Sequence, residues 1–261
     1  MKNTLTFLGT GTSQGVPVIG CDCPVCRSAD PRDKRLRTAA LVHYEGVELV
    51  IDAGPDFRQQ MLRAGVIAPD AILLTHQHKD HTAGLDDVRA FNYTPRDGYK
   101  EVHPCPVYCE ERVQAALRQE FSYAFSEEKY PGIPVFDLHT ITEAPFTVKG
   151  VEIIPIRVMH YRLPVLGFRF GRLAYITDAN RIEEAEMEKL RGVEILILNT
   201  IRFTPHISHF SVPEAIALAE RVGARATWLT HLSHQLPPHA ALCGQLPPHV
   251  QPAYDGLTLE F

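Results

Sequence analysis

The chain has 261 residues, of which 45% are hydrophobic and 22% are charged, and its formal net charge is −5 at pH 7. This composition is ordinary for a globular protein, and residues 1–261 can form a single domain. The acidic balance disfavours a polynucleotide partner, the absence of an apolar run of about 20 residues excludes a membrane-spanning helix, and no export signal is visible, so we expect a cytoplasmic protein.

Short apolar, β-rich runs along the chain end in small or polar residues. The first run, Leu5–Leu8, leads into a glycine-rich turn, and Val47–Ile51 leads into Asp52. Further strands are expected at Ala71–Leu74, Val151–Val158, Leu173–Ile176, Glu194–Leu198 and Ala226–Leu229. Because loops at strand ends can present side chains on a rigid scaffold, the polar residues after these runs are candidates for function.

Helical patterns alternate with these strands, which predicts layered α/β packing. The expected helices are Asp56–Ala64, Glu110–Phe121, Glu183–Leu190 and Val212–Val222. Ser211 precedes the last of them and Glu214 follows three residues later, which is the spacing of a capping box. Residues 91–134 are less regular, and their aromatic side chains fit either the core or a substrate cap.

Four ligand-type side chains fall within six residues directly after the run Ala71–Leu74: His76, His78, Asp80 and His81. Neutral imidazoles and carboxylates suit zinc, manganese or iron, and one compact turn can direct these side chains toward two adjacent metals. Two metals need more ligands than this loop holds. Later strand ends supply them: His160, Asp178 and His231.

A second ligand cluster places three thiols within six residues, at Cys21, Cys23 and Cys26. In a reducing compartment such cysteines are better explained as thiols or metal ligands than as disulfides. Their spacing suits a closed structural zinc site, which needs a fourth ligand. His234 is the candidate, because it follows His231 by three residues and can face away from it.

In their order along the chain, the histidines and aspartates named above resemble the pattern of the metallo-β-lactamase superfamily. The resemblance covers nearly the whole chain and implies an α/β fold, the αβ/βα four-layer sandwich, with metals at one edge of its two sheets. It implies that one divalent ion, manganese or zinc, is held by His76, His78 and His160. It implies that a second such ion is held by Asp80, His81 and His231.

The same resemblance implies that Asp178 bridges the two ions and that Asp52 orients a ligand histidine through a hydrogen bond. A narrower similarity, to PhnP-like phosphodiesterases of the carbon–phosphorus lyase pathway, comes from the glycine turn at residues 9–17, the three-cysteine hook and the segment 229–235. It implies a structural zinc held by Cys21, Cys23, Cys26 and His234. It also implies that His209 is a catalytic histidine near the scissile phosphate.

We therefore expect a dinuclear metal-dependent phosphodiesterase that hydrolyses a small, cyclic phosphodiester through a metal-bridging hydroxide. His209 would protonate the leaving oxygen, with an unperturbed pKa near neutrality, and Asp80 is an alternative base. Two other functions stay open: a PqqB-like metalloprotein of cofactor biosynthesis and a transfer-RNA 3′ processing ribonuclease. Neither a membrane nor nucleic acid is an expected partner, and a homodimer is common in such families.

Overall fold

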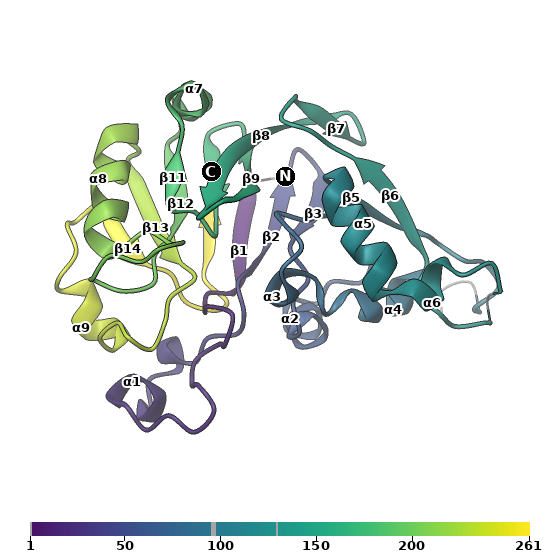
Figure 1. The fold of residues 1–261 in the computed structure, drawn as a ribbon, viewed down its shortest axis with the longest axis horizontal. Coiled ribbons are helices and arrows are strands. Elements are labelled where there is room, and N and C mark those ends of the chain that lie inside the picture. Colours follow the sequence, from purple (N-terminus) through teal and green to yellow (C-terminus); the bar gives the residue numbers. More distant parts are fainter. Residues whose placement is uncertain (1, 95–97, 129) are drawn as a thin grey trace.

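The computed structural model describes residues 2–94, 98–128 and 130–261. Two β-sheets pack face to face, and helices cover the outer face of each sheet (Figure 1). The four-layer α/β sandwich expected from the sequence is therefore confirmed. Within the described residues, no helix is long and apolar enough to cross a membrane.

The strands of the first sheet are Thr4–Gly9 (β1), Ala39–Tyr44 (β2), Val47–Ile51 (β3), Ala71–Leu73 (β4), Cys105–Cys109 (β5), Phe136–Thr140 (β6) and Thr258–Glu260 (β15). They lie in the order β15-β1-β2-β3-β4-β5-β6. Strands β3 to β6 are parallel neighbours, so their carboxyl ends meet at the same edge of the sheet. Asp52 and His76 lie at this edge.

The strands of the second sheet are Phe146–Val148 (β7), Val151–His160 (β8), Leu163–Phe170 (β9), Leu173–Ile176 (β10), Arg181–Ile182 (β11), Ile195–Asn199 (β12), Ala226–Thr230 (β13) and Val250–Pro252 (β14). Their order is β11-β8-β9-β10-β12-β13-β14, and β7 pairs with β8. Strands β10, β12, β13 and β14 are parallel neighbours. Asp178 and His231 follow β10 and β13, and they share the carboxyl edge of this sheet.

The helices are Pro24–Arg27 (α1), Phe57–Ala64 (α2), Lys79–Thr82 (α3), Arg89–Asn92 (α4), Glu111–Glu120 (α5), Ser122–Phe125 (α6), Glu184–Met187 (α7), Val212–Val222 (α8) and His239–Cys243 (α9). Short 3-10 turns lie at Pro31–Asp33, Leu85–Val88 and Glu188–Leu190. The helix expected at Glu183–Leu190 is thus divided into α7 and a tighter 3-10 turn. The strands expected from the sequence are all present, with ends within two residues of the predicted ones.

Apolar side chains fill the space between the layers. Phe7 and Leu49 of the first sheet pack against Phe168 and Tyr175 of the second. One further layer lies between the first sheet and helices α2 and α5, and another lies between the second sheet and α8. Because both faces of the central strands are covered, a strand such as Ile195–Asn199 is buried along its whole length.

Residues 15–38, here called the N-terminal excursion, leave the sandwich between β1 and β2, and α1 lies apart from both sheets (Figure 1). Their own apolar cluster is small and consists of Val16, Val25 and Cys26. At the base of the excursion the buried Arg35 donates from Nη1 to the carbonyl of Ala253 at 2.6 Å. The excursion is therefore held to the sandwich largely by polar contacts.

Candidate active site

The loop that carries His76, His78, Asp80 and His81 runs from β4 into α3 at the carboxyl edge of the first sheet. Two glycines let this loop approach the turn after β3. A Cβ atom on Gly54 would lie 2.0 Å from the carbonyl oxygen of Asp80, and one on Gly84 would lie 2.0 Å from the carbonyl oxygen of Gly54. Backbone contact at these positions leaves no room for a larger residue, so the loop can pack directly against the turn only with glycine there.

The carboxylate of Asp178 is the point on which the loop and the second sheet converge. Its Oδ2 lies 3.7 Å from His76 Nε2 and 3.4 Å from His81 Nε2, and its Oδ1 lies 3.0 Å from His231 Nδ1. Asp80 Oδ2 lies 3.2 Å from His81 Nε2. The ligand atoms of Asp80, His81, Asp178 and His231 all lie within 4.8 Å of one another, and this is also true of His76, His78 and Asp178.

His160 and His209 close the other side of the cluster. The ring centroid of His160 lies 5.2 Å from that of His78 and 4.6 Å from that of His209. His209 in turn stacks on His231, with centroids 4.8 Å apart. Ligand atoms of His160 and His209 lie within 4.8 Å of Asp178 as well. The structure thus brings together every histidine and aspartate that the sequence assigned to this site.

Three of the histidines expected to bind metal have a buried ring nitrogen that makes no hydrogen bond of good geometry with the described residues: His76 Nε2, His81 Nε2 and His231 Nδ1. A buried polar atom without a partner costs roughly 1–3 kcal/mol. Three such atoms around one carboxylate form a cradle for cations, and imidazole and carboxylate donors suit zinc and manganese. The residues present therefore fit a pair of divalent ions.

Hydrogen bonds on the far side of the rings fix their orientation. Asp52 Oδ2 accepts from His81 Nδ1 at 2.7 Å, and Asp52 itself is held by the backbone N–H of Thr75 at 2.9 Å. His160 Nδ1 donates to the carbonyl of Ser208 at 2.8 Å. A neutral ring that donates from Nδ1, such as that of His160, presents an unprotonated Nε2 on its other side, which is the form that binds metal.

Backbone strain is concentrated at the same place. Asp52, Asp178 and His231 have φ angles of 64°, 53° and 57°, in the left-handed region. Such a conformation costs on the order of 1–3 kcal/mol per residue and persists where the surrounding structure enforces it. Each of the three residues lies within two positions of a strand end, where the left-handed turn directs its side chain into the cluster.

Burial and neighbouring charges shift the pKa values of the cluster in different directions. Burial lowers the pKa of His76 and of His231. Burial also acts to lower the pKa of His81, but Asp178 and Asp80 hold it well above its ordinary value. Burial acts to raise the pKa of Asp178, yet His231 and His81 hold it well below the usual range. His81 therefore carries a proton that a bound cation would replace.

The unperturbed pKa expected for His209 is wrong. Burial, reinforced by the nearby His231, lowers the pKa of His209 to about 3. The side chain is 7% exposed, and its Nδ1 has no hydrogen-bond partner among the described residues. At neutral pH the free protein thus holds His209 as a neutral ring.

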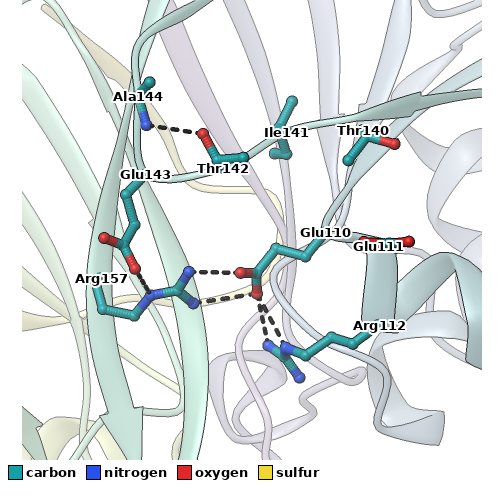
Figure 2. Close-up of a pocket in the computed structure, with 9 residues that line it drawn as sticks. All are labelled: Glu110, Glu111, Arg112, Thr140, Ile141, Thr142, Glu143, Ala144 and Arg157. Carbon is teal, nitrogen blue, oxygen red and sulfur yellow. Dashed lines mark hydrogen bonds and ion pairs between the residues drawn. The ribbon is translucent and has the colours of Figure 1, made fainter.

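Behind the histidine loop lies a pocket crossed by a chain of ion pairs, which Figure 2 shows. Arg157 of β8 pairs with Glu110 Oε1 at 2.5 Å, and Arg112 pairs with Glu110 Oε2 at 2.8 Å. Arg112 Nη1 also donates to Gln77 Oε1 at 2.5 Å. Gln77 stands between His76 and His78, so this chain connects the second sheet to the ligand loop.

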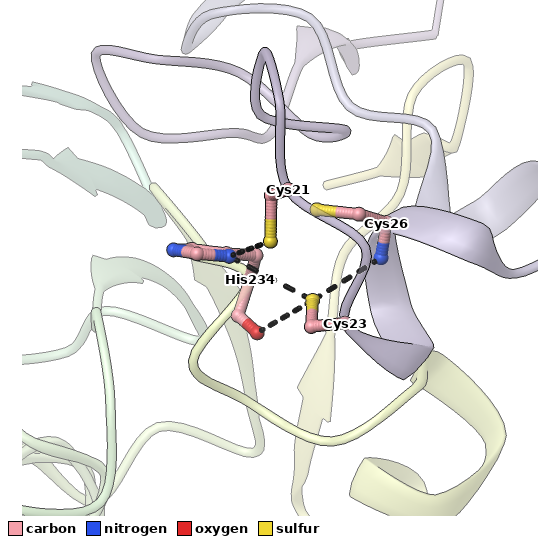
Figure 3. Close-up of side chains that lie close together, drawn as sticks. All are labelled: Cys21, Cys23, Cys26 and His234. Carbon is pink, nitrogen blue, oxygen red and sulfur yellow. Dashed lines mark hydrogen bonds between the residues drawn. The ribbon is translucent and has the colours of Figure 1, made fainter.

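The three cysteines of the N-terminal excursion meet His234 as expected (Figure 3). Cys21 Sγ lies 3.1 Å and Cys23 Sγ 3.7 Å from His234 Nδ1, and the four ligand atoms lie within 4.8 Å of one another. A hydrogen bond from the backbone N–H of Cys26 contributes most to lowering the pKa of Cys23 to about 6. Thiolate and imidazole donors at this separation fit a closed zinc site.

The range 91–134 supplies β5, α5 and α6 to the sandwich. Phe91 and Phe121 pack in the apolar layer outside the first sheet. Residues 95–97 and 129 lie outside the described residues, and the role of this range as a substrate cap stays a prediction.

Three further residues at the site were not predicted from the sequence. Thr75 Oγ1 lies 2.9 Å from His76 Nδ1, the carbonyl of Ser208 accepts from His160 Nδ1, and Gln77 Oε1 accepts from Arg112 Nη1. Thr75 and Gln77 could have been suspected from their place beside His76. Ser208 acts through its backbone carbonyl, which any residue type would supply.

Comparisons with known proteins agree with this geometry. Residues 48–232 match the beta-lactamase superfamily domain. A solved structure described as a new diphosphatase from the PhnP family is 42% identical in sequence to this chain and has a TM-score of 0.91. The match covers 100% of this chain and 98% of that protein's chain.

Two curated relatives have other names. The octanoyltransferase of Porphyromonas gingivalis is 42% identical over 254 residues, which is 96% of this chain but 50% of that protein, so the chain spans about half its length. The coenzyme PQQ synthesis protein B of Methylobacterium nodulans is 26% identical over 212 residues, 74% of this chain and 71% of that protein.

Proposed function

Because the chain belongs to the metallo-β-lactamase superfamily and, within it, to the PhnP family, we propose that it is a metal-dependent hydrolase of a small phosphodiester. The observation that carries this proposal is the cluster around Asp178, in which three buried imidazole nitrogens lack a hydrogen bond among the described residues. A cradle of this kind would be costly to keep if no cation entered it.

We assign the ligands in two sets around Asp178, which would contribute to both. The first set is His76, His78 and His160. The second set is Asp80, His81 and His231. When bound, two manganese or zinc ions would lower the pKa of a bound water and neutralise charge on the phosphate oxygens. A third ion, a structural zinc, is assigned to Cys21, Cys23, Cys26 and His234, and these free thiols favour a cytoplasmic, reducing location.

The chain's own residues would orient the substrate and handle protons. His209 is neutral and lies beside His160 and His231, so its N–H can donate a hydrogen bond to the leaving oxygen. An anionic phosphate next to it would raise its pKa and favour its role as the acid. Burial acts to raise the pKa of Asp80, but His81 holds it below its ordinary value, so Asp80 is ionised, as a metal ligand must be, and would serve as the alternative base only if it bound the second ion weakly.

The scissile bond is the finer part of this proposal. The diphosphatase that resembles this chain acts on a diphosphate, which shares with a phosphodiester an anionic phosphorus centre and a P–O bond to be broken. A second candidate is a PqqB-like role in cofactor biosynthesis, which the 26% identity to a PQQ synthesis protein favours. We rank transfer-RNA processing below both, because the net charge of −5 disfavours a polynucleotide.

The test is hydrolysis of bis(p-nitrophenyl) phosphate by chelator-treated protein before and after manganese or zinc is restored. We expect turnover to return with metal, and the same preparation is then given a cyclic ribose phosphate and a dinucleoside diphosphate to identify the bond. Protein that binds two equivalents of metal at the site but hydrolyses none of these compounds contradicts the proposal. Iron- and oxygen-dependent chemistry in that protein would support the PqqB-like function.

A further inference from the structure

We propose that a depression beside the metal cluster is a subsite for a planar aromatic group of the substrate, and that Tyr161 and Ile207 form it. This inference rests on the proposed function and adds a substrate class to it, namely phosphate compounds that carry an aromatic ring. The assigned residues are outside the ligand set.

The depression encloses about 520 Å³, which is the size of a small-molecule site. It is lined by His78 and His160 of the cluster and by five further residues: Tyr161, Arg162, Leu163, Ile207 and Ser208. A phosphate placed against the cluster would therefore direct one of its substituents into this space. The lining beyond the two histidines is largely apolar, so the substituent it suits is apolar as well.

Tyr161 and Ile207 are large apolar side chains left open to solvent. Tyr161 is 46% exposed and Ile207 is 65% exposed. Single exposed apolar residues are common on protein surfaces, but here two of them come from different segments and line one depression that opens onto the metal cluster. A ligand that covers them would remove apolar surface from water.

The backbone conformation of Tyr161 is energetically unfavourable for an aromatic residue. Residues 161 and 162 form the turn between β8 and β9, where His160 pairs with Leu163. Tyr161 has a φ of 58°, a conformation that favours glycine or asparagine and is an outlier for a bulky residue. An aromatic side chain kept in a strained, exposed turn next to a ligand histidine indicates that the ring itself is needed.

Asn180 fixes the two walls of the depression relative to each other. Its Oδ1 accepts from the backbone N–H of Tyr161 at 2.8 Å, and its Nδ2 donates to the carbonyl of Ile207 at 3.1 Å. Asn180 follows Asp178 by two residues, so the walls are also fixed relative to the centre of the cluster. A site arranged in this way before binding loses little entropy when the ligand enters.

The flat ring of Tyr161 favours an aromatic rather than an aliphatic substituent. Aromatic groups gain from stacking beyond the area that they bury. The guanidinium of Arg162 lies 5.2 Å from the centre of the Tyr161 ring, so one positive charge stands at the edge of the depression. This combination suits a flat ring attached to an anionic phosphate.

The test compares two substrates that both release p-nitrophenolate: bis(p-nitrophenyl) phosphate, whose other substituent is aromatic, and methyl p-nitrophenyl phosphate, whose other substituent is a methyl group. We expect Tyr161→Ala and Ile207→Ala to raise KM for the aromatic substrate, by about tenfold for Tyr161→Ala. KM for the methyl substrate should stay within about twofold. Tyr161→Phe should retain the wild-type preference, and Ile67→Ala, at a side chain 59% exposed elsewhere, is the matched control. Equal changes for both substrates, or no change for either, overturn the subsite.

A binding measurement separates this inference from the proposed function. Calorimetry with metal-loaded protein should show tighter binding of phenylphosphonate than of methylphosphonate, and Tyr161→Asn, which suits the left-handed turn, should abolish the difference. Preference for phenylphosphonate without hydrolysis of any phosphate would support the subsite and contradict the hydrolase. Hydrolysis without a preference for phenylphosphonate would support the hydrolase and overturn the subsite.

Discussion

The cluster around Asp178 and the cysteine hook of the N-terminal excursion are both groups of potential metal ligands, but they are supported in opposite ways. The Asp178 cluster lies at the edge of two sheets that are packed by extensive apolar layers. The hook lies in a segment whose apolar cluster consists of Val16, Val25 and Cys26. In the first region the fold holds the ligands in place, whereas in the second the ligands must help to hold the fold.

This difference predicts separate consequences of metal loss. Without ions at the Asp178 cluster the sandwich keeps its packing, so activity should be lost while the fold persists. Without zinc at the hook the excursion has little apolar area to keep it folded, so stability should fall first. The following variants test this distinction, in decreasing order of expected effect.

The variant Asp178→Asn removes the shared carboxylate and keeps a residue that accepts a positive φ. We expect phosphodiesterase turnover to fall by on the order of 10³-fold or more, with metal content at the cluster reduced. Circular dichroism and the melting temperature should change little. Asp137→Asn, at an exposed carboxylate, is the control. A large loss of folded protein in Asp178→Asn would contradict the expectation that the sandwich stays folded without metal at this cluster.

The variant Cys23→Ser removes one thiol of the hook. We expect the free energy of unfolding to drop by about 2–4 kcal/mol and the melting temperature by about 5–15 °C, with one fewer zinc per chain. Turnover per folded molecule should stay within about threefold. Cys243→Ser, at a partly exposed thiol outside the hook, serves as the matched control, and an unchanged zinc content in Cys23→Ser would show that the hook does not bind zinc.

The contact between the excursion and the sandwich should depend on pH. Burial, with Arg35 beside it, lowers the pKa of His239 to about 4. Arg35 Nη2 lies 3.2 Å from His239 Nδ1, and a guanidinium can only donate, so this ring must be neutral to accept. The unfolded chain takes up the proton near pH 6.5, so stability is complete above that pH and declines as pH falls toward about 4.

The measurement is urea unfolding between pH 4 and pH 7 for the wild type and for His239→Gln, which keeps an acceptor without a titrating group. We expect the wild type to lose about 1–3 kcal/mol more than the variant over this range. If the free energy of unfolding changed with pH in the same way for both proteins, His239 would not be the source of the pH dependence.

The smallest effect is expected from Arg112→Lys, behind the ligand loop. A lysine cannot contact Gln77, Glu110 and the carbonyl of Pro164 together, as the guanidinium does. We expect kcat to fall by about three- to tenfold with little change in KM, because the loop would be less well positioned. Steady-state kinetics measure both constants, and Glu143→Gln, at the exposed end of the same ion-pair chain, should have kinetics near those of the wild type.

The two groups of potential ligands could be predicted partly because each contains a short, local signature and partly from the resemblance to a known family. His76 to His81 and Cys21 to Cys26 combine ligand types at spacings that a single turn can satisfy, and Asp178 and His231 follow recognisable strands. The layered fold followed from the same strands and helices. These features depend on neighbours in sequence, which a single chain shows directly.

Other features depend on neighbours that are distant in sequence. The pKa of His209 is set by burial among residues of several segments, so its value of about 3 could not be predicted from the residues next to it in the sequence. Arg112 meets Gln77 across 35 positions, and Asn180 joins Tyr161 to Ile207 across two loops. The helix expected at Glu183–Leu190 ends early because its last turn tightens to a 3-10 form, which the apolar periodicity does not distinguish.

The left-handed backbone at Asp52 and Asp178 also determines which mutations of the gene would go unnoticed. Asparagine is well suited to that conformation, and a single nucleotide change converts an aspartate codon into an asparagine codon. The resulting chains would fold, escape the proteases that remove damaged proteins, and accumulate without function. Within a population of such genes, inactive alleles would therefore be found by reading these two codons rather than by measuring protein abundance.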